Sequence, residues 1–336
     1  MESQTPSISV VIPVYNGEAV IAETLDSVRD QSYDNVEIIV VNDSSTDRTK
    51  EICERPDVKL INLDENAGPA NARNIGVGEA TGEIILFIDT GVALDEPDTL
   101  SKLSWKFVER PDIAGVVMIR NKKALNPGLT PKFWAMINYF EWLRAPEYHT
   151  SFATERSAVR ASVIQGMKLF DGDYKAADVE DHEFGFRLHE MGHKILVAHE
   201  IIVSDRFDTL RQATKKLLRR SFYWFRLFTK RKQFDTVWNT KDRATKTLLG
   251  GVTLPVLLIS LVVLHPLLFA VCILVFLGYL RYCYQFYIWV GCSEGKPYLV
   301  FPFVFLELYF SSIILAGATW SLIDLLLHRN PAQTSN

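Results

Sequence analysis

The feature that most constrains this chain is an apolar run without a single charge, from residue 248 to residue 280. A helix needs about 20 apolar residues to cross a bilayer, so this run is too long for one crossing. His265-Pro266 lies near its middle, and proline removes a backbone donor and disfavours helix at the residue before it. We therefore expect a helical hairpin whose halves occupy residues 248–264 and 267–288.

A second apolar run, residues 298–327, contains only two charged residues, Glu307 and Asp324. Either side chain can face a partner helix instead of lipid, because ionisable groups within a membrane usually point into the protein. The two runs together predict about three membrane crossings over residues 247–328, with two crossings as the alternative.

A basic segment precedes the first predicted crossing. Residues 206–246 contain 13 Lys and Arg against three Asp. Basic residues directly before a crossing mark the cytoplasmic side of a membrane. The chain also shows no early apolar stretch with a basic flank and a cleavage site, as a signal peptide would have. We therefore expect a multi-pass protein of the cell membrane whose N-terminal part is cytoplasmic.

The same basic segment has the composition of an amphipathic helix at a membrane surface. Arg219, Arg220 and Arg226 surround the aromatic residues 222–225, as expected for a helix in the headgroup layer. Two roles fit this composition: a plain connector to the membrane, or a part in holding an anionic lipid substrate.

The net charge of −4 conceals a strong asymmetry along the chain. Residues 1–205 carry 34 Asp and Glu against 20 Lys and Arg, whereas residues 206–336 carry 6 against 16. This distribution excludes a uniform nucleic-acid binder, and we expect no nucleic-acid partner. None of the four cysteines forms a CxxC pair, so neither a disulfide framework nor a Cys-rich zinc site is predicted.

Between residues 8 and 117, short β-branched runs alternate with helical stretches. This alternation predicts an α/β fold with a doubly wound, mostly parallel sheet. Ligands of such sheets bind outside the carboxyl ends of the strands, and there the sequence places Asn16, Asp43 and Asp89. No GxGxxG motif follows the first strand and no GxxxxGK motif occurs, so neither a Rossmann dinucleotide site nor a P-loop is expected.

Four motifs of the N-terminal part carry a resemblance to a known family. They are VVIPVYN at residues 10–16, VVNDSSTD at 40–47, ENAGPANARNIGVGEATGEIILFID at 65–89 and VEDHEF at 179–184. In this order they resemble the family 2 glycosyltransferases of glycosyltransferase A fold. The apolar C-terminal region is similar to that of family members that act on lipid-linked acceptors.

The resemblance implies a division of the chain into functional parts. A cytoplasmic glycosyltransferase domain that binds a nucleotide sugar would occupy residues 1–205, and a basic amphipathic interfacial segment residues 206–246. The transmembrane helices would follow, with a short tail at residues 329–336.

The resemblance also assigns a donor pocket. In the family, the Asp that matches Asp43 accepts a hydrogen bond from the nucleobase. Pro13, Tyr15 and Asn16 resemble the part of the pocket that stacks on the ring and offers backbone groups. Arg73, in a helix that begins with Gly-Pro, would approach the diphosphate. Alternatives stay open, because Asp43 also suits a turn or a helix cap, and Arg73 suits a surface salt bridge.

Asp89 follows the most apolar strand and resembles the first Asp of the family's Asp-x-Asp motif. That motif holds a divalent cation, Mg²⁺ or Mn²⁺, against the diphosphate, but here Gly91 replaces the second Asp. A hard cation held by one or two carboxylates and phosphates loses much of its site when one carboxylate is missing. Metal dependence is therefore open. Asp95 could substitute, unless it caps a helix, or Arg73 could supply the counter-charge without metal.

Glu180 and Asp181 begin a helix that is expected to run to about residue 191. By resemblance, Asp181 is the base that deprotonates the acceptor hydroxyl in an inverting single displacement, and Glu180 is its neighbour in the acceptor site. Acidic residues also favour helix starts, so capping is the alternative for this pair. If the acceptor is a phosphate, which is already ionised, Asp181 would only position it.

Residues 189–193 read HEMGH, which matches the HExxH motif of zinc proteases. Gly192 before basic residues is typical of a helix end, so His193 is expected beyond the last turn. A membrane zinc protease is therefore the least favoured interpretation. A third interpretation is a nucleotide-binding homologue that has lost catalysis through Gly91.

The resemblance, together with the apolar C-terminal runs, implies a membrane-anchored, inverting glycosyltransferase of hexosyltransferase type. It would move one sugar from a nucleotide-sugar donor to a lipid-linked or membrane-proximal acceptor, such as a glycan, in glycolipid or polysaccharide biosynthesis of the cell envelope. Processive polysaccharide synthases of the same family carry a Gln-x-x-Arg-Trp helix, and this chain has no such spacing, which favours transfer of a single sugar.

Overall fold

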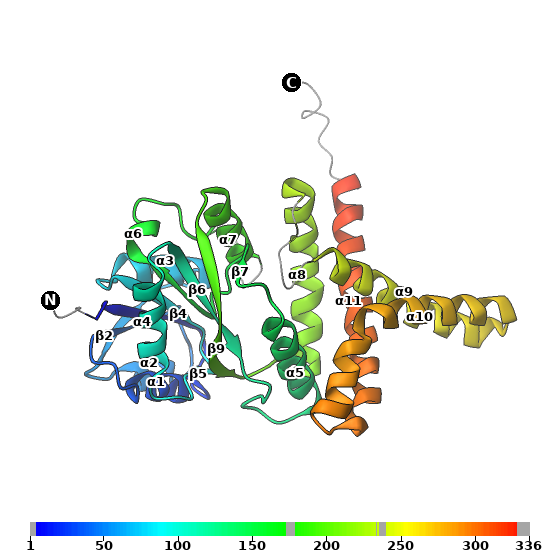
Figure 1. Ribbon diagram of the computed structural model, residues 1–336. Helices are drawn as coiled ribbons and strands as arrows, with labels where there is room; N and C mark the ends of the chain where they lie inside the picture. The colour runs from blue at the N-terminus through cyan, green and yellow to red at the C-terminus, as the bar shows by residue number, and fades with distance from the viewer. Residues whose placement is uncertain (1–4, 173–178, 233, 235–239, 328–336) are drawn as a thin grey trace. The chain divides into compact units, whose positions relative to one another are not determined.

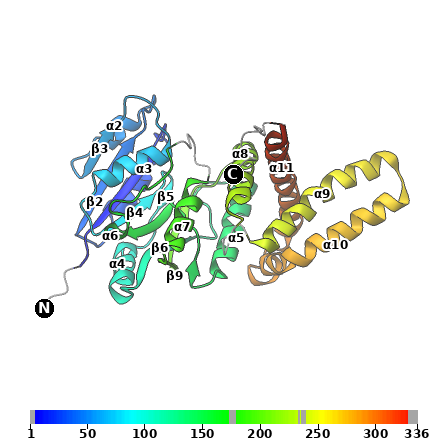
Figure 2. The same ribbon diagram turned by 90° about the horizontal axis from the view of Figure 1, so that it is seen from above.

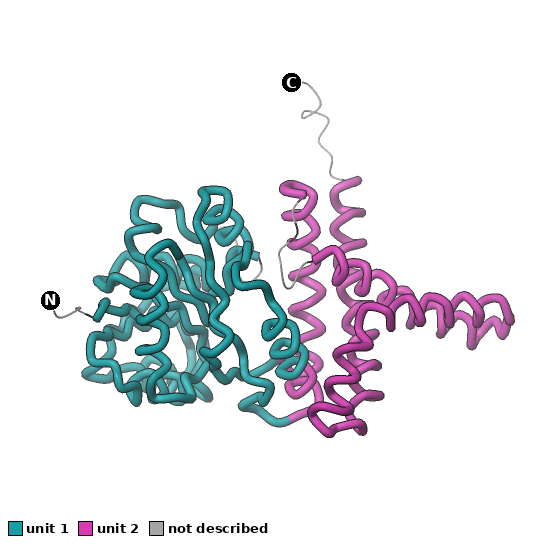
Figure 3. The backbone as a smooth tube through the Cα atoms, in the orientation of Figure 1, with its two compact units in different colours: residues 1–127, 134–207 teal, residues 128–133, 208–336 magenta. Residues whose placement is uncertain are grey.

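A computed structural model describes residues 5–172, 179–232, 234 and 240–327 of the chain. Its contacts divide the protein into two compact units, which Figure 3 colours separately. The first unit comprises residues 1–127 and 134–207, and the second comprises residues 128–133 and 208–336. The tail expected at residues 329–336 lies outside the described residues.

The first unit is built on a sheet whose first half is parallel. β1 (Ile8–Val14) pairs with β2 (Val36–Asn42) and β4 (Ile84–Ile88), and β2 pairs with β3 (Val58–Asn62). These are the runs that the sequence predicted as strands. β1 and β4 are buried along their whole length, because helices cover both faces of the sheet.

The second half of the sheet is mixed. β8 (Arg156–Arg160) runs antiparallel between β4 and β6 (Ile113–Arg120), and β9 (Lys194–Asp205) is parallel to β6. Two short strands, β5 (Val92–Ala93) and β7 (Tyr148–His149), pair with β9 in antiparallel. The α/β class and the parallel first half are confirmed. β8 was not predicted, because RSAVR carries an arginine at each end.

Helices cover both faces of this sheet, as Figures 1 and 2 show. α1 (Ile21–Arg29), α2 (Thr49–Cys53) and α4 (Thr99–Glu109) share one hydrophobic core with one face. α3 (Pro69–Gly78) packs on the other face. α7 (Glu180–Glu190) lies on the same side as α3, since Phe184 packs on Phe170 and Phe152, which both contact Phe87 of β4. The remaining helices that begin before residue 207 are α5 (Leu129–Leu143) and α6 (Ala161–Ile164).

The second unit is helical in the part that the structure describes. α8 (Leu210–Arg231) packs along α11 (Val300–Leu327), and α9 (Lys241–Val263) packs against α10 (Pro266–Ile288) and α11. A π-helical turn (Trp289–Ser293) follows α10, and a 3-10 turn (Pro297–Leu299) precedes α11. With these turns, α9, α10 and α11 form three helices long and apolar enough to cross a membrane. Only Leu264 and His265 separate α9 from α10, where the sequence predicted a hairpin, and Figures 1 and 2 show the two helices side by side.

Both acidic residues of α11 face partner side chains inside this unit, as the sequence analysis allowed. Glu307 accepts a hydrogen bond from Lys246 Nζ at 2.6 Å, and both residues are buried. The hydroxyls of Tyr279, at 2.9 Å, and Tyr287 donate to the second Glu307 oxygen. Asp324 forms an ion pair with Arg226 of α8. The charged groups of this apolar helix are thus neutralised by neighbouring helices.

Candidate active site

The carboxyl ends of β1, β2 and β4 are joined by hydrogen bonds. The Asp43 N–H donates to the Val14 carbonyl at 2.8 Å, and the Thr90 hydroxyl donates to the Pro13 carbonyl at 3.0 Å. The segments that follow these three strands therefore meet at one edge of the sheet, where ligands of such sheets bind.

Arg73 of α3 links the charged side chains at this edge of the sheet. Its guanidinium lies 2.7 Å from Asp89 Oδ1 and 3.2 Å from Glu180 Oε1. The Arg73 and Glu180 side chains are almost fully buried, whereas the Asp89 side chain is 39% exposed. Residues from α3, the end of β4 and the start of α7 thus form one linked group, and the surface salt bridge considered for Arg73 is replaced by a buried one.

This arrangement fixes the charge of Arg73. Burial alone lowers the pKa of the guanidinium, but the carboxylates of Asp89 and Glu180, with a smaller contribution from Asp181, raise that pKa above its ordinary value. Arg73 is therefore permanently charged and is paired with the Asp89 carboxylate, which is partly exposed. Such a group can hold Asp89 in place and add positive potential where a diphosphate would lie.

Asp43 binds the loop that precedes α3. Its carboxylate accepts hydrogen bonds from the N–H groups of Ala67 at 2.7 Å and Gly68 at 2.9 Å, and the residue is only 3% exposed. These bonds join the end of β2 to the loop before α3, and they differ from the local turn or helix cap that the sequence allowed for Asp43. A carboxylate has further lone pairs beyond these two bonds, so its contact with a nucleobase stays a prediction.

The other predicted pocket residues lie around the end of β1. Pro13 is buried within the strand, and Tyr15 is 53% exposed. Asn16 adopts a left-handed conformation, with φ of 50°, and its side-chain oxygen accepts from the Thr46 N–H at 2.8 Å. Asn16 therefore holds the loop after β2 against the end of β1, and Tyr15 is the ring that remains open to solvent.

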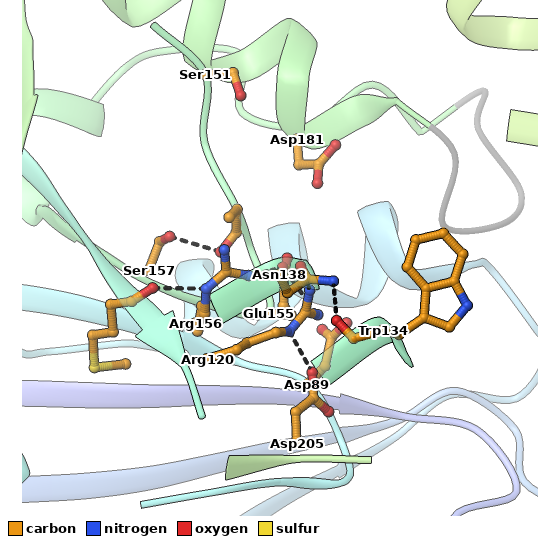
Figure 4. Close-up of polar contacts among 12 residues, drawn as sticks. Asp89, Arg120, Trp134, Asn138, Ser151, Glu155, Arg156, Ser157, Asp181 and Asp205 are labelled. Carbon is orange, nitrogen blue, oxygen red and sulfur yellow. Dashed lines mark hydrogen bonds and ion pairs between the residues drawn. The ribbon is translucent and has the colours of Figure 1, made fainter. Parts of the chain in front are cut away.

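Asp181 is the second residue of α7 and is 9% exposed. One of its oxygens accepts from the His182 N–H at 2.8 Å. Figure 4 shows its carboxylate directed from α7 toward a group of polar side chains around Arg120 and Asn138. Glu180, the preceding residue, connects the same helix start to Arg73 and Asp89.

The group around Arg120 was not predicted from the sequence. Arg120, the last residue of β6, donates to Asp205 at 2.7 Å, to Glu155 at 3.1 Å and to Asn138 at 3.2 Å. The Asp89 N–H donates to the Glu155 carbonyl at 3.3 Å, so this group adjoins the end of β4. The sequence did carry a signal for this group. Arg120 and Asp205 each end an apolar strand, just as Asp89 follows an apolar strand.

Burial raises the pKa of Asp205 to about 6, although Arg120 opposes the shift. The folded protein therefore keeps a proton on Asp205 that the unfolded chain releases near pH 3.8. Between pH 4 and pH 6 the folded state binds more protons, so stability falls as the pH rises, by about 3 kcal/mol for a shift of about 2 units.

We expect the Asp205→Asn variant to lack this decrease in stability between pH 4 and pH 6. In denaturant titrations at pH 4, 5, 6 and 7, the free energy of unfolding of the variant relative to wild type should increase up to pH 6 and then stay constant. Parallel pH dependences of the two proteins would contradict the shift.

Comparison with known proteins identifies the N-terminal part. Residues 9–167 match the family model described as Glycosyl transferase family 2. The chain carries a family 2 glycosyltransferase domain. The matched residues include β1 to β4 and the loops that follow them, with Asp43, Arg73 and Asp89.

Relatives and solved structures agree with this glycosyltransferase assignment. GlyA of Streptococcus pneumoniae is 40% identical over 112 residues, which are 32% of this chain and 16% of GlyA. The poly-β-1,6-N-acetyl-D-glucosamine synthase of Staphylococcus epidermidis is 33% identical over 129 residues, which are 36% of this chain and 31% of the synthase. The matches thus span less than a third of these relatives' lengths. The mannosyltransferase PcManGT of Pyrobaculum calidifontis, solved with GDP-Man and Mn²⁺, has the same fold, with a TM-score of 0.61. The two sequences are 18% identical, and the match covers 96% of this chain and 88% of PcManGT.

At the position where the resemblance implies a divalent cation, the structure places one carboxylate, that of Asp89. Gly91 has a φ of +101°, where a side chain is strained, and an added Cβ would contact the Arg206 side chain at 3.6 Å. Asp95, the other candidate, binds the Ser204 hydroxyl instead. Among the described residues, no three His, Cys, Asp or Glu form a group that could hold a metal ion. The residues fit a cation whose other ligands are diphosphate and water oxygens.

The zinc-protease interpretation disagrees with the end of α7. The helix ends at Glu190, and Gly192 has a φ of +82°. His193 therefore lies beyond the helix, and the one-face geometry of two HExxH imidazoles is not formed.

Proposed function

We propose that this glycosyltransferase is membrane-anchored and inverting, and that it transfers one sugar from a nucleotide-activated donor to a lipid-linked or membrane-proximal acceptor. The observation that carries the proposal is the linked group of Asp89, Arg73 and Glu180, with Asp181 beside it, in a chain whose later helices suit a membrane. The proposed parts are the glycosyltransferase domain at 1–205, the interfacial segment at 206–246 and the membrane region at 247–328.

The proposed reaction is a single displacement. Asp181 takes the proton of the acceptor hydroxyl while the hydroxyl oxygen forms a bond to the anomeric carbon of the donor sugar. The bond from that carbon to the diphosphate breaks on the opposite side, so the anomeric configuration inverts. Glu180 is held by Arg73 and fixes the start of α7, which sets the position of Asp181.

The donor would lie along the ends of β1, β2 and β4. Tyr15 offers a ring for the base, Asn16 and Pro13 shape the loop beneath it, and Asp43 adds a carboxylate. The diphosphate would lie at Asp89, and a divalent cation bound there would neutralise its charge. The GDP-Man complex of PcManGT supports a nucleoside-diphosphate hexose as donor, and the S. epidermidis synthase supports a glycan acceptor.

We expect removal of divalent cations to weaken donor binding without unfolding the protein, because Asp89 alone makes no resident metal centre. EDTA should leave the melting temperature of the donor-free protein unchanged and raise the dissociation constant of the donor, measured by calorimetry. A lower melting temperature in EDTA would instead indicate a structural metal.

The membrane part of the proposal concerns α8. Arg211, Lys215 and Arg219 are exposed and four residues apart, so they form one stripe on this helix. A basic stripe on an amphipathic helix before membrane-spanning helices suits anionic headgroups. This supports an acceptor that reaches the enzyme from the bilayer.

Cys292 can report the orientation of the membrane helices. It is exposed between α10 and α11, whereas Cys53, Cys272 and Cys283 are buried. With three crossings and a cytoplasmic N-terminal domain, this turn lies on the cytoplasmic side and His265 on the opposite side.

An impermeant maleimide should label Cys292 in inverted vesicles and not in intact cells. In a Cys292→Ser background, His265→Cys should show the reverse pattern. Labelling of both positions from one side would contradict the hairpin, and exchange of the two patterns would contradict the orientation.

Purified full-length protein in lipid nanodiscs tests the proposed function with a panel of UDP-sugars and GDP-mannose. We expect nucleoside diphosphate release from at least one donor and transfer to an extracted membrane lipid. Nucleotide binding without release from any donor would favour a homologue that has lost catalysis, and absence of both would contradict the proposal.

A further inference from the structure

Three buried polar side chains lie in a row behind Asp181. They are His182, Ser151 and His149, which are 9%, 1% and 3% exposed. His182 Nδ1 lies 3.0 Å from Ser151 Oγ, and Ser151 Oγ lies 3.1 Å from His149 Nε2. We propose that this row is a proton relay, which receives from Asp181 the proton taken from the acceptor. The inference rests on the proposed function of Asp181 as base.

The row is held in place by close packing of α7. A Cβ on Gly185 would lie 2.3 Å from the Phe152 nitrogen and 2.4 Å from the Ser151 backbone, so only glycine lets α7 approach this segment. Since His182 is three residues before Gly185 on α7, it meets the Ser151 side chain. His149 ends β7, and its ring makes a T-shaped contact with the Trp142 ring, with centroids 5.0 Å apart.

Charged groups lie at the two ends of the row. His182 Nε2 lies 4.0 Å from Asp181 Oδ1, an ion-pair distance once the imidazole is protonated. At the other end, the Arg156 guanidinium lies 4.6 Å from the centre of the Trp142 ring and is paired with Glu155.

The proton transfer balances without any further reactant. When the acceptor O–H bond breaks, an O–H bond forms on Asp181. Once the Asp181 carboxyl and His182 Nε2 close from 4.0 Å to hydrogen-bond distance, that bond breaks as an N–H bond forms at His182 Nε2, which restores the Asp181 carboxylate and leaves an imidazolium. His182 can pass its Nδ1 proton to Ser151, whose own proton then moves to His149 Nε2.

The relay requires opposite protonation of the two nitrogens that contact Ser151. A hydroxyl has one proton, so it donates to one imidazole nitrogen and accepts from the other. Nitrogen NMR of the full-length protein with ¹⁵N-labelled histidine, assigned by single His→Asn variants, should show one protonated and one bare nitrogen. The same state at both nitrogens would overturn the relay.

Kinetics supply the second test, with release of nucleoside diphosphate from GDP-mannose and UDP-N-acetylglucosamine and water as acceptor. His182→Ala should lower kcat by roughly 10-fold to 100-fold and leave the donor KM unchanged. This decrease in kcat should be smaller than the decrease caused by Asp181→Asn, which removes the base. Added imidazole should restore part of kcat in this variant and none in Asp181→Asn. Ser151→Ala should lower kcat in the same direction.

His189→Asn is the matched control, since His189 is exposed on the same helix, and its kcat should equal that of wild type. Unchanged kcat in His182→Ala, or no effect of imidazole, would overturn the relay. If the wild-type protein releases nucleoside diphosphate from no donor, this result contradicts the proposed function and not the relay. The ¹⁵N spectrum of the histidines then tests the relay alone.

Discussion

Asp181→Asn is expected to lower kcat for transfer to a hydroxyl by about 10²-fold to 10⁴-fold, the usual contribution of a general base. The amide keeps the shape of the side chain and can still accept from the His182 N–H, so the fold should persist. Donor binding should also persist, because the residues proposed to hold the donor lie on β1, β2, α3 and the end of β4. Turnover and calorimetric donor binding, measured on the same preparation, test both statements.

Glu183→Gln is the matched control for this prediction. Glu183 lies two residues further along α7, and its carboxylate accepts from Arg187 at 2.8 Å, so its role is helix support. Its kcat should remain near that of wild type. Unaltered transfer in Asp181→Asn would remove Asp181 as the base, and equal losses in both variants would indicate damage to α7 instead of lost chemistry.

The second large effect is expected in the second unit. Glu307→Ala leaves Lys246 buried without its carboxylate and removes the acceptor of the Tyr279 and Tyr287 hydroxyls. Loss of one partner of a buried ion pair usually costs about 3–5 kcal/mol. We therefore expect a large decrease in the stability of the second unit. A thiol-reactive dye reports it, because Cys272 and Cys283 of α10 are buried until the helices separate.

Two further variants separate charge pairing from general damage. Asp242→Asn, at an exposed position in the first turn of α9, should change stability by less than about 0.5 kcal/mol. The double variant Lys246→Met, Glu307→Leu removes both charges and should recover most of the loss. A double variant as unstable as Glu307→Ala would show that the ion pair is not the cause.

Much of the fold was predictable because single segments carry its signal. The strands of the parallel half are short apolar runs, and the helices apolar enough to cross a membrane come from long ones, the first interrupted at His265-Pro266. The motifs placed Asp89 after a strand and Asp181 at the start of a helix, as the structure has them, and their roles stay predictions. Each of these features is local in the sequence.

The contacts between these segments were not predictable. Arg120 and Asp205 each end an apolar strand, but their pairing depends on β6 and β9 being neighbours, 85 residues apart in the chain. β8 was missed because Arg156 and Arg160 make it polar, and burial of Arg156 follows only from its place in the sheet. Ser151 has no sequence signal, and it meets His182 only because Gly185 lets α7 approach.

The central claim is that the ends of β1, β2 and β4, together with the start of α7, form one nucleotide-sugar site. An experimental structure of the full-length protein with GDP or UDP tests it most directly. The account predicts the base between Tyr15 and Asp43, the diphosphate at Asp89, and Asp181 facing the position of the sugar. A nucleotide bound elsewhere, or bound here with Asp181 turned away from the diphosphate, would contradict it.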